Sequence, residues 1–121
     1  MSEYSPITDE DNWFIGEKKF IDFTIIKEDG SVANITTWDL EWTLRQAPGA
    51  TTHMLQKTSV LGGITKTDPT NGICRVSIDA DDTLDLGIRG GRFSHALKRV
   101  DGANDAVLSF GEAVLKAAAS R

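Results

Sequence analysis

The side chains that could serve as a nucleophile or a general base are few in this sequence. The chain contains one cysteine, Cys74, and two histidines, His53 and His95. A cysteine nucleophile needs a histidine base, a group that orients the base and donors for an oxyanion. Cys74 instead alternates with Val76 and Ile78, a pattern typical of a small core residue. We therefore expect Cys74 to be structural, and a single cysteine cannot form an internal disulfide.

The densest acidic cluster is a candidate for cation binding or for helix capping. It comprises Asp79, Asp81, Asp82 and Asp85. Several carboxylate oxygens suit Ca²⁺, but an EF-hand loop needs acids at alternate positions, a glycine and a distal glutamate, which this spacing lacks. Acidic residues at the N-terminal end of a helical turn interact favourably with the helix dipole, and Gly87 can end such a turn. The spacing favours a capped turn over residues 79–86, so Ca²⁺ should leave the melting temperature unchanged.

A glycine-rich, basic stretch at residues 87–92 has part of the composition of a phosphate-binding loop. It lacks the Lys-Ser/Thr ending of a P-loop, and no long helix follows that could point its N-terminus at a phosphate. We interpret it as a turn that enters a strand. The main basic concentration of the chain consists of Arg89, Arg92, Lys98 and Arg99. These side chains are expected to be solvated edge residues that discourage contacts between sheet edges, with a local anionic contact as the alternative.

These residues together give no arrangement for acid–base, metal or nucleophilic catalysis, so the sequence predicts no enzyme and no cofactor. The 121 residues favour one domain. A net charge of −5, from 13 Lys and Arg against 18 Asp and Glu, argues against nucleic acid or an anionic membrane as a partner. No apolar run reaches the length of a transmembrane helix, and the start lacks a secretory signal, so we expect synthesis in the cytoplasm.

Alternating apolar residues predict the strands of the domain. The clearest strand is residues 38–45, where Trp38, Leu40, Trp42 and Leu44 alternate with polar residues, a period that no helix produces. One face should lie in a core and the other in water, as in an antiparallel sheet. Further strands are expected at residues 20–27, 32–35, 53–58, 73–78, 92–100 and 107–115. About seven strands separated by turn signals indicate an all-β sandwich with one short helical turn, and a small barrel is the alternative closure.

Residues 1–16 differ from the rest of the chain. They are polar and acidic, contain Pro6, and end in the apolar cluster Trp13-Phe14-Ile15 directly ahead of the first clear strand. We therefore divide the chain into an extended N-terminal arm, residues 1–16, and a β-sandwich domain, residues 17–121.

The apolar residues of the arm have no core of their own, except that Phe14 or Ile15 can close the end of the sandwich. We expect the arm to dock on a neighbouring subunit as an added strand or in an apolar groove. Its predicted partner-binding residues are Tyr4, Ile7, Trp13 and Phe14. The domain should then fold without residues 1–12 but fail to enter an assembly. An arm that stays disordered is the alternative.

Several stretches taken together resemble a family of phage proteins. They are Phe14-Ile15-Gly16-Glu17, Glu28-Asp29-Gly30, Ile35-Thr36-Thr37-Trp38, Leu40-Glu41-Trp42-Thr43-Leu44-Arg45, Gly63-Ile64-Thr65-Lys66-Thr67-Asp68, Asp79-Ala80-Asp81-Asp82-Thr83 and Gly91-Arg92-Phe93-Ser94-His95-Ala96-Leu97. In this order they resemble small immunoglobulin-like β-sandwich proteins of tailed-phage virions, and they are similar to the N-terminal domain of phage baseplate upper proteins. The resemblance covers residues 14–116.

The resemblance implies an immunoglobulin-like antiparallel sandwich and a structural role in the virion. The chain would be assembled in the host cytoplasm, in multiple copies, with other virion proteins as its partners. The baseplate proteins continue into a further fibre or receptor-side region, which leaves a position in the tail, baseplate, neck or head open. A cellular ligand-binding or adhesion module on the same fold is the alternative.

Overall fold

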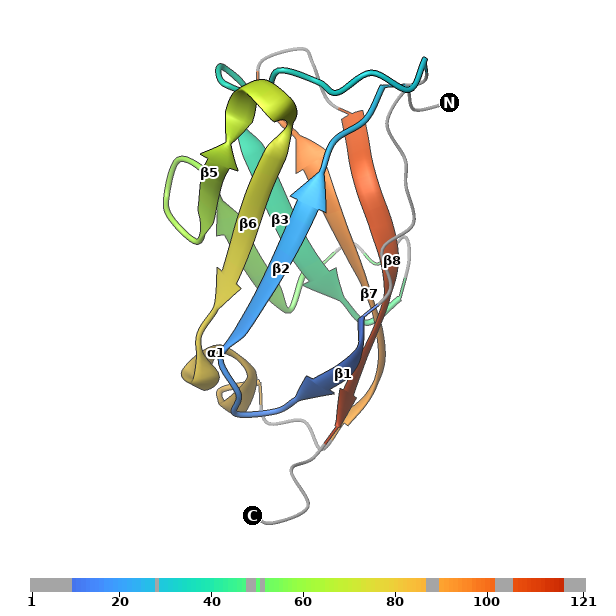
Figure 1. Ribbon diagram of the computed structural model, residues 1–121. Helices are drawn as coiled ribbons and strands as arrows, with labels where there is room; N and C mark the ends of the chain where they lie inside the picture. The colour runs from blue at the N-terminus through green and yellow to red at the C-terminus, as the bar shows by residue number, and fades with distance from the viewer. Residues whose placement is uncertain are drawn as a thin grey trace.

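The computed structural model describes residues 10–27, 29–47, 50, 52–86, 90–101 and 106–116. The strands in these ranges form two sheets that pack face to face (Figure 1). They are β1 (Glu10–Phe14), β2 (Lys19–Thr24), β3 (Leu40–Arg45), β4 (Leu55–Thr58), β5 (Ile64–Asp68), β6 (Ile73–Ile78), β7 (Gly90–Arg99) and β8 (Ala106–Lys116). A 3-10 turn, η1 (Pro69–Asn71), precedes β6, and a short helix, α1 (Ala80–Leu84), follows it. The predicted all-β sandwich is confirmed.

The strand order is that of an immunoglobulin-like domain. One sheet has the order β1-β8-β7-β3-β4 and the other the order β2-β6-β5. With β2 lettered B and β4 as the extra C′ strand, these are the G-F-C-C′ and B-E-D groupings of that fold. Every pair of named strands is antiparallel except β1 with β8, which is parallel. The two separate sheets make the closure a sandwich and not the small barrel.

The predicted alternation defines the core between the sheets. Buried as expected are Trp38, Leu40, Trp42, Leu44, Ile21, Phe23, Ile25, Cys74, Val76 and Ile78. Thr43, which was expected to face water, is also buried. It lies between two neighbouring strands of the five-stranded sheet, opposite Ala96 of β7 and Gln56 of β4. Because its side chain is small and has neighbours on both sides, those neighbours cover it.

The predicted boundary after residue 16 does not match the structure of residues 10–16. β1 is a strand of the five-stranded sheet, where Trp13 is paired with Leu115 of β8. Trp13 is buried in the core between the sheets. Residues 10–16 therefore belong to the sandwich, because β1 pairs with β8 and Trp13 packs in the core. Residues 1–9 of the expected arm lie outside the described residues.

Two further details of the predicted strands change. Residues 64–68, which are absent from the predicted strands, form the edge strand β5. Residues 32–35 are not a strand, since only Val32 forms an isolated bridge, with Ile26. Ala33 and Ile35 are nevertheless buried, so this segment contributes to the core without joining a sheet. The pairing of β7 with β8 shifts register between Leu97 and Lys98, as at a β-bulge.

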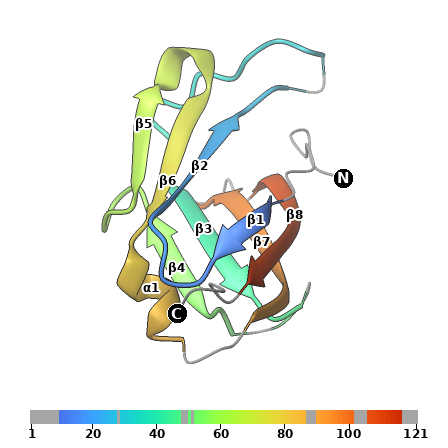
Figure 2. The ribbon, with the colours of Figure 1, turned by 60° about the horizontal axis from the view of Figure 1, so that its bottom comes forward.

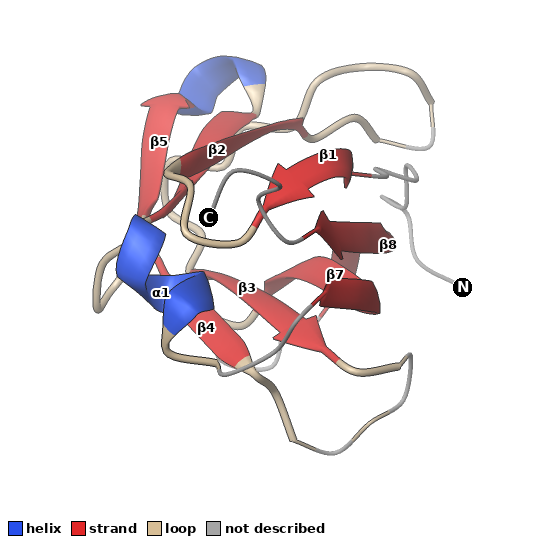
Figure 3. Cartoon of the chain, turned by 90° about the horizontal axis from the view of Figure 1, so that it is seen from below, coloured by secondary structure: helices blue, strands red, loops and turns tan. Residues whose placement is uncertain are grey.

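The helix α1 closes the lower end of the sandwich, where it lies beside β4 (Figures 2 and 3). Its buried Thr83 accepts a hydrogen bond at Oγ1 from the backbone N–H of Gly16, 2.8 Å away. Gly16 follows β1 with a φ of +84°, a left-handed conformation that suits glycine. This bond ties the β1–β2 turn to the helix. Neither of the helical segments in the described part of the chain has the length and apolar character needed to span a bilayer.

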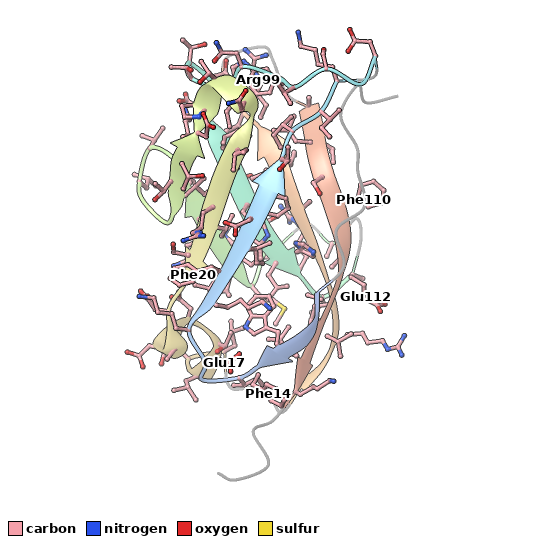
Figure 4. All side chains as sticks on the ribbon, in the orientation of Figure 1. Phe14, Glu17, Phe20, Arg99, Phe110 and Glu112 are labelled. Atoms are coloured by element: carbon pink, nitrogen blue, oxygen red, sulfur yellow. The ribbon has the colours of Figure 1, made fainter. Side chains whose placement is uncertain are left out.

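Asp101 stabilises the upper end of the sandwich. Its carboxylate accepts hydrogen bonds from Arg99 Nε at 2.8 Å and Nη2 at 3.0 Å, and from the backbone N–H of Asp39 at 3.2 Å. Arg99, labelled in Figure 4, also stacks its guanidinium 4.1 Å from the ring centroid of Trp38. The hydrogen bonds from Arg99 lower the pKa of Asp101 from 3.8 to about 2.

This pKa predicts how Asp101 contributes to stability at acidic pH. A depressed folded-state pKa gives a contribution that is complete above pH 3.8 and is lost as the pH falls towards 2. The Asp101→Asn variant should therefore be less stable than the parent at pH 5–7, and the difference should shrink between pH 4 and 2. Urea unfolding followed by circular dichroism at several pH values measures this. A difference that stays constant down to pH 2 would show that the ionised carboxylate is not responsible.

Gly72 is expected to be intolerant of any side chain. It has a φ of +74°, and a Cβ at this position would lie 2.7 Å from the carbonyl oxygen of Ile25 and 2.8 Å from that of Ala33. The left-handed conformation alone costs a non-glycine residue about 1–2 kcal/mol, and the contact with two backbone oxygens adds to this. Gly72→Ala should lower the free energy of unfolding by about 2–3 kcal/mol.

Gly30 provides the matched control. Its φ is +90°, but a Cβ there would meet nothing within 4 Å. Gly30→Ala should cost only the conformational part, about 1–2 kcal/mol. Urea denaturation of both variants gives the comparison. Equal losses would mean that the backbone around Gly72 relaxes to accept a methyl group.

Candidate functional site

The predicted partner-binding residues of the arm are in different situations. Tyr4 and Ile7 lie outside the described residues. Trp13 is fully buried, with its ring centroid 6.1 Å from that of Trp42. Because it packs inside its own domain it cannot anchor a partner, and that prediction is wrong. Phe14 is partly exposed at the lower end of the molecule (Figure 4), and its role in partner binding stays a prediction.

The buried histidine has a structural role in the core. His95 Nδ1 accepts a hydrogen bond from Trp42 Nε1 at 3.1 Å, so this nitrogen carries no proton. Its ring centroid lies 6.3 Å from that of Phe23 on the opposite sheet. Antibody domains place a disulfide between the corresponding strands, beside a buried tryptophan. Phe23 and His95 meet across the sandwich in a similar position. The second histidine, His53, is exposed ahead of β4.

Cys74 is unsuited to act as a nucleophile. It is fully buried on β6. Burial, and secondly the charge of Asp22, raise the pKa of its thiol from 9.0 to about 12. The thiolate, which is the reactive form, is therefore scarce at neutral pH. The structural role expected for Cys74 agrees with this environment.

Alkylation of Cys74 is expected to be very slow in the folded protein. A pKa about three units higher reduces the thiolate fraction about 1,000-fold at pH 7, and burial also blocks the approach of a reagent. Iodoacetamide labelling, followed by mass spectrometry, should be at least that much slower in buffer than in concentrated urea. Rapid labelling in buffer would show that β6 opens readily.

The acidic cluster includes a helix cap. Asp82 Oδ2 accepts a hydrogen bond from the backbone N–H of Asp79 at 2.8 Å, as in a capping box. Asp82 also forms an ion pair with Lys57 Nζ, at 2.8 Å. The capping role predicted for this cluster is thus confirmed for Asp82. Within the described ranges, no group of three or more His, Cys, Asp or Glu side chains is placed to hold a metal ion. The expected indifference to Ca²⁺ stays a prediction.

β2 forms an edge of the three-stranded sheet and directs backbone groups away from it. Directly after β2, the Ile25 N–H donates to the carbonyl of Gly72, so Ile21 and Phe23, four and two residues earlier, direct their backbone groups towards β6. Residues 20, 22 and 24 then direct theirs to the other side, because the direction alternates along an antiparallel strand. No described strand pairs with that side. β1, the preceding strand, pairs with β8 of the other sheet instead.

Phe20 is the exposed aromatic residue of this edge. Its side chain is 47% exposed and lies on the outer face of β2 (Figure 4). Lys18 Nζ lies 5.3 Å and Arg75 Cζ 5.0 Å from its ring centroid. Arg75 is held in turn by Asp22, with 2.8 Å between Nε and Oδ1. The ring is therefore fixed between two cations, beside a row of backbone groups with which no described strand pairs. We call this surface, Lys18 to Thr24 with Arg75, the β2 edge.

Sequence reasoning missed the β2 edge, although one signal was present. Ile21, Phe23 and Ile25 identify the buried face of this strand, so Phe20 occupies a position where water-facing polar residues are expected. A similar signal occurs at Val60 and Leu61, two large aliphatic residues directly before the Gly62-Gly63 turn. Both sites are apolar where the local pattern calls for polar residues.

Comparison of the chain with models of known protein families gives no match, and comparison with curated proteins gives no significant similarity.

Proposed function

We propose that the chain is a non-enzymatic structural protein of a tailed-phage virion that acts through protein–protein contacts in the assembled particle. Its place would be in the tail, baseplate, neck or head, in multiple copies, with other virion proteins as partners. The virion assignment is supported by the sequence resemblance over residues 14–116. The immunoglobulin-like strand order is consistent with it.

The observation that carries this proposal is the β2 edge. Exposed strand edges with free backbone N–H and C=O groups bind other chains by strand addition, and neighbouring side-chain sites supply specificity. Here Phe20 lies beside the backbone row and is flanked by Lys18 and Arg75. A partner strand would gain both backbone hydrogen bonds and an aromatic contact.

The state of the chemistry-bearing residues favours binding over catalysis. Cys74 is buried, His95 is hydrogen-bonded to Trp42, and Asp82 caps α1 while pairing with Lys57. Each of these groups already has a structural role. The net charge of −5 favours proteins over nucleic acid or an anionic membrane as partners.

Analysis of purified particles tests the proposal. Particles from the phage that encodes this chain are purified on density gradients and examined by quantitative mass spectrometry. The expected result is the intact chain at a fixed copy number per particle. Its presence only in the soluble host lysate would overturn the virion assignment and favour the cellular ligand-binding or adhesion module.

Substitution of Phe20 tests the surface. Phe20→Ser should reduce the number of copies per particle, whereas Phe110→Ser should leave it unchanged. Phe110 is a matched control because it is 42% exposed and lies on β8, well separated from Phe20 in Figure 4. Equal incorporation of both variants would show that the β2 edge is not the contact.

A further inference from the structure

The turn between β4 and β5 presents two large aliphatic side chains to solvent. Val60 is 70% exposed and Leu61 is 86% exposed, the highest values among the large hydrophobic residues described. The turn projects from the side of the sandwich (Figures 1 and 2). We call Val60 and Leu61 the β4–β5 tip. Exposed aliphatic residues side by side on a protrusion have no role in the core of this domain, so their position calls for another explanation.

The β4–β5 tip is held in one conformation by local hydrogen bonds. Thr58 and Gly62 exchange backbone bonds of 3.1 and 3.0 Å, and Thr58 Oγ1 accepts from the Leu61 N–H at 2.7 Å. Ser59 and Leu40 fasten the turn to β3, through Ser59 N–H to Leu40 O at 2.9 Å and Leu40 N–H to Ser59 Oγ at 2.8 Å. A tip built in this way loses little conformational freedom when it binds.

The surroundings of the tip determine the kind of partner that suits it. Residues 58–65 contain no charged residue, in a chain that is 26% charged. The flanking lysines are both engaged: Lys57 pairs with Asp82 at 2.8 Å, and Lys66 Nζ donates to the carbonyls of Thr36 at 3.0 Å and Trp38 at 2.5 Å. Neither is available for an anionic lipid headgroup, the usual electrostatic attraction of a membrane surface.

We propose that the β4–β5 tip inserts into an uncharged, apolar socket on another protein of the assembled particle. This inference rests on the proposed function. It adds a second contact surface, separate from the β2 edge. A rigid pair of aliphatic side chains without nearby free charge complements a preformed apolar pocket, since both sides bury apolar area without leaving an ion unpaired. From the apolar area of a leucine side chain, its removal should weaken binding about 10- to 100-fold.

The test uses the full-length chain, supplied during infection to a phage that lacks its gene. The variant carries Val60→Ser and Leu61→Ser together. Val32→Ser is the matched control, because Val32 is 44% exposed on a different segment of the chain. Both variants should keep nearly the melting temperature of the parent, since mainly exposed side chains contribute little to stability. Copies per particle are measured at a limiting concentration of chain.

The expected result is at least a tenfold loss of incorporation for the double variant and normal incorporation for Val32→Ser. If the parent chain enters particles and the double variant enters them equally well, the tip is not a contact, and the proposed function stands. If the parent chain does not enter particles at all, the proposed function fails and this inference fails with it.

Two measurements on the purified chain examine other occupants of the tip. Sedimentation would detect self-association that the double substitution abolishes, which would place the socket on a second copy. Flotation with phosphatidylglycerol vesicles would detect lipid binding lost in the same variant. Either result would overturn the proposal that the socket lies on a different protein of the particle.

Discussion

Replacing Trp42 with alanine is expected to lower the free energy of unfolding by about 3–5 kcal/mol. Trp42 is fully buried, and its ring centroid lies 6.1 Å from those of both Trp13 and His95. It also donates the hydrogen bond to His95 Nδ1, which is lost with the indole. Because a typical domain is stable by about 5–15 kcal/mol in total, this change should remove a large share of the stability.

Urea unfolding followed by far-ultraviolet circular dichroism measures this loss, and Trp42→Phe is its control. Phenylalanine keeps an aromatic ring in the core but cannot donate to His95, so it should cost about 1–3 kcal/mol. The parent chain should have a spectrum dominated by strand. A spectrum dominated by helix, or an alanine variant as stable as the parent, would contradict this placement of Trp42.

The strands that could be predicted from the sequence are those whose own residues mark a buried face. In β3, a large apolar side chain at every second position faces the opposite sheet, and the same period identifies β6. This signal is local, because strand geometry itself sends alternate side chains to opposite faces. The turn at residues 79–86 was predictable for a similar reason, since its capping residues are close in sequence.

The two missed strands depend on residues far away in the chain. β1 contributes Trp13 to the core, and its position is set by parallel pairing with β8, about a hundred residues later. A local pattern contains no information on such a partner. β5 is an edge strand in which only Ile64 is buried, so it has no alternation to detect. Lys66 in this strand is fixed instead by its bonds to the carbonyls of Thr36 and Trp38.

The candidate contact surfaces were predictable only in part. Phe20 and the β4–β5 tip are apolar residues at water-facing positions, and the sequence contains this signal. The sequence does not indicate that one side of β2 lacks a partner among the described strands, because this depends on β1 joining the other sheet. The pairing of β1 with β8 also explains why the prediction for Trp13 was wrong: the segment that was expected to have no core of its own contributes Trp13 to the core of the sandwich.

Replacing Trp13 with alanine is therefore expected to lower the free energy of unfolding, again by about 3–5 kcal/mol. The side chain is fully buried against Trp42, and β1 is attached to the sheet through β8 alone among the named strands. Loss of the ring would leave a cavity and weaken the docking of the whole strand. Urea unfolding of the variant and the parent under the same conditions measures the difference.

Two comparisons make this result specific to the core role of Trp13. Its Nε1 is buried and has no hydrogen-bond partner among the described residues, so Trp13→Phe loses no bond and should cost clearly less than Trp13→Ala. Removal of residues 1–9 leaves β1 intact and should preserve most of the stability, whereas removal of residues 1–16 should cost at least as much as Trp13→Ala. If the chain without residues 1–16 unfolded at the same urea concentration as the parent, β1 would not be part of the cooperative domain, and Trp13 would again be a candidate anchor for a neighbouring protein.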